Sequence, residues 1–419
     1  MDTTILGFHT GTPPRPTGGL ARTVQTLDWL FRQLDVAIRW NERIAAPEFK
    51  RGEREWQRLN RRQEDAWREE IGASYRDTQN RALLFGREAW TRCLNALLAD
   101  RQEDPVLAWL DLNFRDKWDG TPRLDGLLSN IFTVDPENPF AAWAGRYPFL
   151  GAAFRTMFPG AKLDEFPTLV GPEGCGKSTF CAWALPEELR GELFTDGLDL
   201  AGRAKDRADT ILGKMIVEVS ELVGLNRSEI ESVKAFISRV DDGNVRLSYE
   251  ARAEPLPRRC VFIGTSNRQT DLLPADPAGN RRFVIVPVKP HPHGVAQVRE
   301  YLEENREQLW SEAWTRVLRN EHPRLPDHLK SAQADANKQY RVRDDLLEDR
   351  VEQWLAGKDY DAFTTATAAV GCGLIRNEGD AASIRVDDAR RLGAALRLAG
   401  FEKRRERIGQ ARVFVWGRR

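Results

Sequence analysis

The sequence predicts an α/β protein built on a parallel sheet, and three features carry this prediction. Short apolar segments at 166–170, 215–219, 260–264 and 283–288 have the length and the apolar character of buried strands. Helical patterns separate several of these segments, as in a sheet whose parallel strands are joined by crossover helices. The first segment runs directly into a glycine-rich loop that ends in Lys-Ser. We therefore expect a parallel-sheet core with a ligand-binding loop.

Length and composition limit the classes of protein to consider. The chain has 419 residues, of which 41% are hydrophobic, so it can form packed cores and is not globally disordered. Basic and acidic residues number 63 each, so a nucleic-acid site requires local clustering of charge. The scattered cysteines show no CxxC spacing, which argues against zinc or disulfide frameworks. Because no apolar run could cross a membrane and no signal peptide is visible, we expect a cytoplasmic protein.

The regions beside the core differ from it in sequence character. Glycines and prolines over 1–22 predict an irregular arm, and spaced apolar residues predict a helical region over 23–150. The core is expected over 151–295, and a helical extension over 296–358. In 359–419, two short helical patterns precede a basic segment and a closing strand, an order that resembles a winged helix.

The glycine-rich loop is the strongest chemical signal in the chain. It fits GxxxxGK[ST] and stands between a strand and a helix, which is the context that a phosphate-binding loop requires. The glycines let backbone N–H groups face a phosphate, and the helix N-terminus adds partial positive charge. Lys177 is expected to reach the β- and γ-phosphates of ATP, and Ser178 to hold Mg²⁺. The predicted ATP-binding residues are Gly171, Pro172, Glu173, Gly174, Cys175, Gly176, Lys177, Ser178 and Thr179.

Side chains near the later strands complete the predicted catalytic site. Glu218 and Glu221 lie three residues apart at the second strand, where adjacent acids are usual. We assign Glu218 to the metal and Glu221 to the attacking water, with the reverse assignment left open. Asn267 follows the third strand, where its amide can orient water beside the γ-phosphate. Either Arg281 or Arg282, before the fourth strand, fits a transition-state cation supplied by a neighbouring subunit; surface ion pairing is the alternative.

These motifs together resemble the virulence-associated E family of phage and mobile-element proteins, whose ATPase core is similar to superfamily 3 helicases of the AAA+ class. The resemblance rests on segments at 118–124, 171–178, 216–222, 234–249, 259–267, 279–283 and 308–313. It implies an AAA+ core that binds ATP and Mg²⁺, a homo-oligomeric ring with a hexamer as the expected form, and replication partners such as a primase. The chain departs from many members because no primase-polymerase is recognisable at its N-terminus, so priming activity is not carried over.

The resemblance also indicates a hairpin that contacts DNA between the second and third strands. Residues 245–249 alternate apolar and polar side chains, as in a half-exposed strand. In superfamily 3 helicases, such a hairpin grips single-stranded DNA through basic and aromatic side chains. The candidates here are Lys234, Arg246, Tyr249 and Arg252; a solvated hairpin without a ligand is the alternative.

The C-terminal segment is a second candidate DNA contact. Residues 401–419 contain seven Lys or Arg against two Glu, a local charge of +5 in a chain of zero net charge. Such a patch attracts the phosphate backbone, and Lys403, Arg404 and Arg405 are the candidates. A domain that binds another protein is the alternative.

Two functions follow from these sites. The leading hypothesis is an ATP-dependent DNA helicase or translocase that acts on single-stranded or forked DNA in phage or mobile-element replication. The alternative is an ATP-dependent DNA-binding switch, initiator or loader that hydrolyses ATP without unwinding. A small-molecule kinase is disfavoured because the sequence shows no lid or acceptor site.

Overall fold

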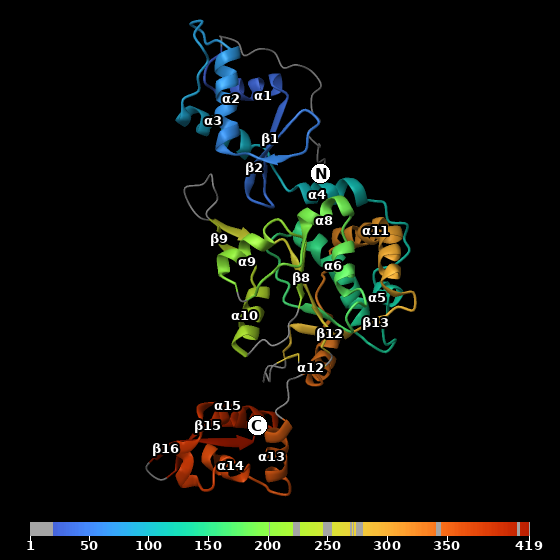
Figure 1. Cartoon of the computed structure of the whole chain (residues 1–419), viewed down its shortest axis with the longest axis vertical. Coiled ribbons are helices and arrows are strands. Elements are labelled where there is room, and N and C mark those ends of the chain that lie inside the picture. The colour runs from blue at the N-terminus through green and yellow to red at the C-terminus, as the bar shows by residue number, and fades with distance from the viewer. Residues whose placement is uncertain are drawn as a thin grey trace.

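The computed structural model describes residues 20–200, 202–220, 227–245, 254–268, 270, 272–273, 280–340, 345–408 and 411–418. Three bodies follow one another along its long axis: an N-terminal body of residues 20–103, a core of residues 104–340 and a C-terminal body of residues 345–418 (Figure 1). Each terminal body has a hydrophobic cluster of its own, and the core has two. Within the described ranges, no helix is both long and apolar enough to cross a membrane.

The core is built on a five-stranded parallel sheet, which confirms the predicted fold class. Its strands, in spatial order, are β12 (Phe283–Pro287), β6 (Phe166–Val170), β11 (Val261–Ser266), β8 (Ile216–Ser220) and β7 (Phe194–Thr195). The strand side chains are shared between two hydrophobic clusters, one on each face. Burial on both faces explains why these strands appear in the sequence as apolar runs without alternation.

Helices cover both faces of this sheet. Helices α6 and α11 lie on one side, and α9 and α10 on the other (Figure 1). The core helices are α4 (Pro105–Phe114), α5 (Leu127–Ile131), α6 (Ala141–Met157), α7 (Lys177–Trp183), α8 (Glu187–Leu193), α9 (Ala204–Ile211), α10 (Arg227–Ile237), α11 (Gly294–Leu318), η1 (Asp327–Leu329) and α12 (Lys330–Lys338). Two short strand pairs complete the core, β5 (Phe132–Thr133) with β13 (Lys289–Pro290), and β9 (Asp241–Val245) with β10 (Glu254–Pro257).

The N-terminal body corrects the prediction of a purely helical region. It contains a four-stranded sheet, in the order β3-β2-β1-β4, beside three helices. Its elements are α1 (Val24–Gln33), β1 (Val36–Asn41), β2 (Ala46–Arg51), β3 (Gln57–Arg58), α2 (Arg61–Ser74), α3 (Arg87–Ala99) and β4 (Gln102–Glu103). Among the described strand residues, Val36, Ile38 and Phe49 are buried in the hydrophobic cluster, and the partly buried Trp40 packs against it. Charged residues fill much of the other face, so the two-residue period of the strands is faint in the sequence.

The C-terminal body begins earlier than predicted. Its elements are α13 (Asp345–Leu355), β14 (Ala362–Thr364), α14 (Thr365–Gly371), η2 (Glu378–Ser383), α15 (Val386–Leu398), β15 (Phe401–Ile408) and β16 (Ala411–Arg418). Helix α13 belongs here because Leu347, Val351 and Trp354 lie in this body's hydrophobic cluster. The two expected helices are present, and Thr364 caps α14 by accepting a hydrogen bond from the Thr367 N–H. The winged-helix assignment stays a prediction.

A buried carboxylate joins the N-terminal body to the core. Asp104 caps α4 and accepts both 3.0 Å hydrogen bonds of a bidentate pair from Arg43, in the turn between β1 and β2. It also accepts a 2.6 Å bond from Arg259, which precedes β11. Arg43 in turn donates to the Thr156 hydroxyl in α6. Because both Arg43 and Asp104 are buried, removing one partner leaves the other's charge desolvated and unpaired.

We expect Asp104→Asn to lower the free energy of unfolding by about 3–5 kcal/mol at pH 7. Burial acts to raise the pKa of the Asp104 carboxyl, but the charges and hydrogen bonds of Arg43 and Arg259 outweigh burial and hold that pKa below its usual value. The carboxylate therefore stabilises the fold above its unfolded-state pKa of about 3.9, and this contribution is lost as the pH falls through the folded-state pKa.

Urea denaturation of both proteins across this pH range tests the expectation. The difference in unfolding free energy between Asp104→Asn and the wild type should begin to shrink below about pH 4, where the unfolded wild type becomes protonated at Asp104, and should be smallest once the pH has fallen through the lower folded-state pKa. Asp111→Asn is the control, since Asp111 forms a half-exposed pair with Arg115 and should matter little. If the free energy of unfolding differed between Asp104→Asn and the wild type by the same amount at all pH values, the ion pair would not explain the loss of stability.

Candidate functional site

The glycine-rich loop joins β6 to α7 in a conformation that glycine alone accommodates at several positions. Gly174 and Gly176 have φ angles of 73° and 100°, in the left-handed region. A Cβ atom on Gly171 would lie 2.1 Å from the carbonyl oxygen of Val288, and one on Gly176 would lie 2.9 Å from a methyl group of Val298. The loop therefore packs its backbone against the segment from β12 to α11 while it turns toward the helix.

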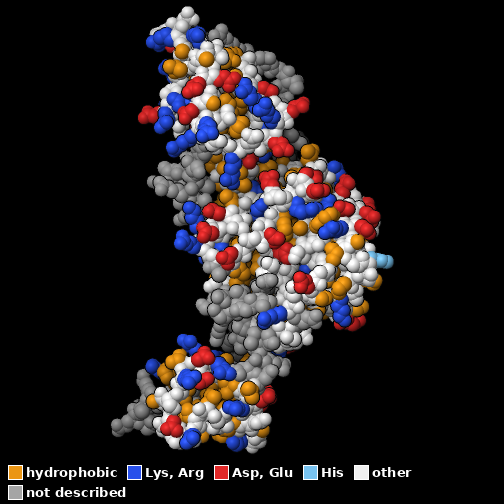
Figure 2. Space-filling model, viewed as in Figure 1, with side chains coloured by type: hydrophobic (Ala, Val, Ile, Leu, Met, Phe, Trp, Pro, Cys, Tyr) orange, Lys and Arg blue, Asp and Glu red, His pale blue; other side chains and the backbone are white. Residues whose placement is uncertain are grey.

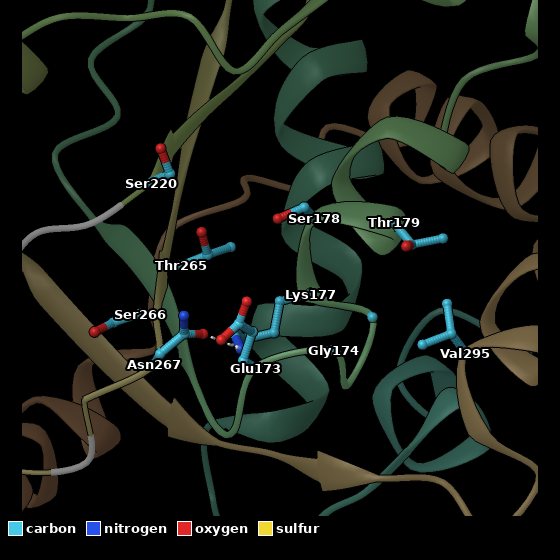
Figure 3. Close-up of a pocket in the computed structure, with 11 residues that line it drawn as sticks. Glu173, Gly174, Lys177, Ser178, Thr179, Ser220, Thr265, Ser266, Asn267 and Val295 are labelled. Carbon is cyan, nitrogen blue, oxygen red and sulfur yellow. Dashed lines mark hydrogen bonds between the residues drawn. The ribbon is translucent and has the colours of Figure 1, made fainter.

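A pocket of about 300 Å³ opens beside this loop (Figure 3). It lies at the carboxyl ends of β6, β8 and β11, where ligands bind in open α/β sheets. Its volume is at the small end of the range for ligand pockets. The residues that line it are Glu173, Gly174, Gly176, Lys177, Ser178, Thr179, Ser220, Thr265, Ser266, Asn267 and Val295.

Lys177 is buried at the floor of this pocket, where its ammonium donates to three oxygen acceptors. The donor–acceptor distances are 2.8 Å to the carbonyls of Gly171 and Pro172 and 3.0 Å to Oδ1 of Asn267 (Figure 3). Asn267 lies just beyond the end of β11, so the parallel pairing of β11 with β6 brings the amide to the loop. The predicted site residues Lys177 and Asn267 are therefore in direct contact.

Glu218, on β8, lies beside the first turn of α7. The hydroxyls of Ser178 and Thr265 both donate to its Oε1, at 2.6 and 2.7 Å. The other oxygen, Oε2, is buried and has no hydrogen-bond partner among the described residues. A buried carboxylate oxygen without a partner is unfavourable unless a cation or a donor approaches it.

The oxygen atoms of Ser178 and Glu218 are suitable ligands for Mg²⁺. The ion prefers oxygen ligands and is commonly bound by one or two carboxylates together with phosphate oxygens and water. Ser178 and Glu218 offer a hydroxyl and an unpartnered carboxylate oxygen side by side. Among the described residues, no group of three or more His, Cys, Asp or Glu side chains could hold a metal by itself. A metal here would therefore depend on ligands from a nucleotide.

The structure locates the remaining predicted site residues in different places. Glu221 lies outside the described residues. Cys175, which is part of the glycine-rich loop, has a buried side chain. Arg281 and Arg282 do not line the pocket, because they precede β12, which runs parallel to β6 with Phe283 opposite Phe166. They therefore lie at the amino edge of the sheet, opposite the phosphate-binding loop.

Four residues that line the pocket are absent from the sequence prediction: Ser220, Thr265, Ser266 and Val295. Thr265 and Ser266 belong to the polar end of β11, and their signal in the sequence is that they directly precede Asn267 in the run Thr-Ser-Asn. Thr265 lies opposite Ser220 in the β11–β8 register. Val295 comes from the start of α11 and had no signal in the sequence, because only packing brings that helix to the loop.

The candidate DNA contacts divide into described and undescribed residues. Strand β9 pairs antiparallel with β10, with Val245 opposite Glu254, in the interval where the hairpin is expected. Arg246, Tyr249 and Arg252 lie outside the described residues. Lys234 lies on α10 with only 4% of its surface exposed, so its ammonium is not offered to a ligand in this conformation. Lys403, Arg404 and Arg405 are exposed on β15.

Several solved structures resemble this chain over much of its length, but their sequences are at most 17% identical to it. The C-terminal region of NrS-1 is 13% identical, with 93% of this chain and 99% of that chain covered and a TM-score of 0.45. An inhibitor-bound JCV helicase is 17% identical, covers 64% of this chain and 70% of its own, and has a TM-score of 0.27. The FIGL-1 AAA domain is 15% identical, with 54% of this chain and 97% of that chain covered and a TM-score of 0.23.

The family comparison is more direct. No curated protein matches the chain. The model of the virulence-associated protein E-like domain matches residues 112–342, which include the phosphate-binding loop, Glu218 and Asn267. This match covers more than half of the chain, and the chain therefore belongs to the virulence-associated protein E-like family.

Proposed function

We propose that this protein is a Mg-ATP-dependent DNA helicase or translocase that acts in the cytoplasm. The observation that carries the ATPase part is the convergence of Lys177, Ser178, Glu218 and Asn267 at one edge of the sheet. Each has a side chain that phosphoryl transfer requires: a cation for the phosphates, a hydroxyl and carboxylate for the metal, and an amide for water. Bound Mg²⁺ would neutralise charge on the β- and γ-phosphates.

The contacts of Lys177 suggest how nucleotide binding changes this site. Its ammonium is held by loop carbonyls and by Asn267. A γ-phosphate carries more negative charge than these neutral oxygens, so the ammonium would turn toward it. Asn267 would then be free to orient the attacking water, with Glu221 or Glu218 as the acid that polarises it.

DNA binding is assigned to two places. The β9–β10 hairpin would present Arg246, Tyr249 and Arg252 to single-stranded DNA, and the C-terminal body would present Lys403, Arg404 and Arg405. The subunits would assemble as a ring, with a hexamer as the expected form. In this ring Arg281 or Arg282 completes the neighbouring site, and replication partners such as a primase would act on the same phage or mobile-element DNA.

A forked-duplex unwinding assay with ATP tests this proposal against the alternative. Strand separation that requires ATP and Mg²⁺ supports a helicase. Hydrolysis that DNA stimulates, without strand separation or movement along a single strand, would instead support a switch, initiator or loader. ATP turnover that DNA leaves unchanged would contradict both DNA-directed functions.

We expect a chain that ends at Tyr340 to keep basal ATP hydrolysis and to bind forked DNA more weakly. The truncation removes the whole C-terminal body, which begins at Asp345 and has its own hydrophobic cluster. If the local charge of +5 contacts phosphate, the slope of log affinity against log salt should fall in magnitude by about 4. Fluorescence anisotropy at several salt concentrations measures this slope. An unchanged DNA affinity would show that the C-terminal body binds something else.

A further inference from the structure

The C-terminal hairpin of β15 and β16 carries an aromatic side chain that the sequence analysis did not single out. Phe414 is 51% exposed, although it lies in a strand next to buried Val415 and Trp416. Its strand partner is Arg405. The guanidinium carbon of Arg405 lies 4.9 Å from the centre of the Phe414 ring, and the ammonium of Lys403 lies 5.1 Å from it. Two cations therefore lie over a ring that is still half open to solvent.

Strand alternation separates these residues from the third basic candidate. Lys403 and Arg405 share one face of the hairpin with Phe414, and we call this surface the Phe414 face. Arg404 lies on the opposite face, where it pairs with Glu406 at 2.7 Å. The consecutive basic residues Lys403, Arg404 and Arg405 therefore belong to two different surfaces. One holds cations beside an exposed ring, and the other holds a cation already paired with a carboxylate.

The inner end of the hairpin is anchored, so the Phe414 face is held in position. Phe401 and Trp416 are buried in the hydrophobic cluster of the C-terminal body. The Trp416 indole donates a 3.0 Å hydrogen bond to the hydroxyl of Thr365. The hairpin lies in the body farthest from the N-terminal body (Figure 1). On the side shown in Figure 2, basic side chains, with some acidic ones among them, lie around apolar side chains over this body.

We propose that the Phe414 face binds unpaired nucleotides of single-stranded DNA, with the ring stacked on a base and Lys403 and Arg405 on the flanking phosphates. An aromatic ring stacks on any base whose face is accessible, and a duplex hides those faces between base pairs. The cations match the charge of the strand, whose backbone carries one phosphate per nucleotide. This inference rests on the proposed DNA binding by the C-terminal body, and adds an unpaired strand and a stacking residue.

Fluorescence anisotropy with the full-length chain tests the proposal, using an oligo-dT strand and a duplex of the same length as probes. Phe414→Ala should weaken binding of the single strand by about 5- to 150-fold, which is the range of one lost base–aromatic stack, and leave duplex binding unchanged. The salt dependence should stay the same, because no phosphate contact is lost. Arg405→Ala should instead reduce the slope of log affinity against log salt by about 0.7.

Three further variants separate stacking from other roles of the residue. Phe414→Tyr keeps a ring and should bind the single strand as the wild type does, which also shows that the hairpin tolerates substitution. Phe414→Leu keeps an apolar side chain without a ring and should behave like Phe414→Ala. Val386→Ala removes another exposed apolar side chain of the same body and should have no effect.

The outcomes distinguish this inference from the proposed function. Wild-type affinity of Phe414→Leu for the single strand, or equal losses on single strand and duplex, would overturn stacking. If Phe414→Ala binds normally while ATP-dependent unwinding persists, this inference is wrong and the proposed function stands. If the wild type neither binds DNA nor hydrolyses ATP, both are wrong.

Discussion

Replacing both Arg281 and Arg282 with alanine is expected to reduce ATP hydrolysis by about 10³–10⁵-fold while ATP binding is retained. The two arginines lie at the amino edge of the sheet, whereas the pocket lies at its carboxyl edge. Lys177 is the only basic residue among the described residues that line this pocket. No second cation of the same subunit lines the pocket within the described ranges, and in the proposed ring an arginine of the next subunit would supply it.

Mixing variants tests whether the arginines act in trans. Neither the double arginine variant nor Lys177→Ala should hydrolyse ATP alone. A mixture should recover part of the activity, because some interfaces then join an intact phosphate-binding loop to an intact arginine pair. Arg61→Ala/Arg62→Ala is the matched control, since these adjacent arginines are exposed on α2 of the N-terminal body. No recovery at any ratio, together with full activity of the wild type as a dilute monomer, would exclude the ring model.

Lys177→Ala is the second change with a large expected effect, a loss of at least about 10²–10³-fold in ATP hydrolysis. Negative charge on the phosphates grows in the transition state, and the Lys177 ammonium is the cation that the described pocket offers to neutralise it. Its three oxygen contacts already place it at the loop. The same change should weaken binding of ATP less than it slows hydrolysis, since the backbone N–H groups of the loop remain.

Steady-state phosphate release and titration with a fluorescent ATP analogue measure these two quantities separately. Lys162→Ala is a suitable control because Lys162 is an exposed lysine of the core, 62% exposed, with one ion pair to Asp164. Lys177→Gln tests whether the charge itself is needed, since it keeps most of the length of the side chain. Normal turnover by either Lys177 variant would mean that the loop is not the site of hydrolysis.

The core was predictable from sequence because its signals are local. Strands β6, β8, β11 and β12 are buried on both faces, so each appears as a mostly apolar segment without regular alternation. The phosphate-binding loop was equally clear, since its glycines, lysine and serine follow one another within eight residues of the sequence. The sheet of the N-terminal body was not predictable in this way. Its short strands carry few buried residues, and charged neighbours made the segment look like exposed helix.

What the sequence determined by itself was which residues have the chemistry for phosphoryl transfer: Lys177, Ser178, Glu218 and Asn267. What only the tertiary structure decided was which of them meet and on which side of the sheet they lie. Parallel register brings Asn267 to the Lys177 ammonium and Thr265 to Glu218, although long stretches of chain separate them. Strand direction carries Arg281 and Arg282 to the opposite edge, and strand alternation separates Arg404 from Lys403 and Arg405. Register and direction arise from pairing between distant segments, so no local pattern of residues contains them.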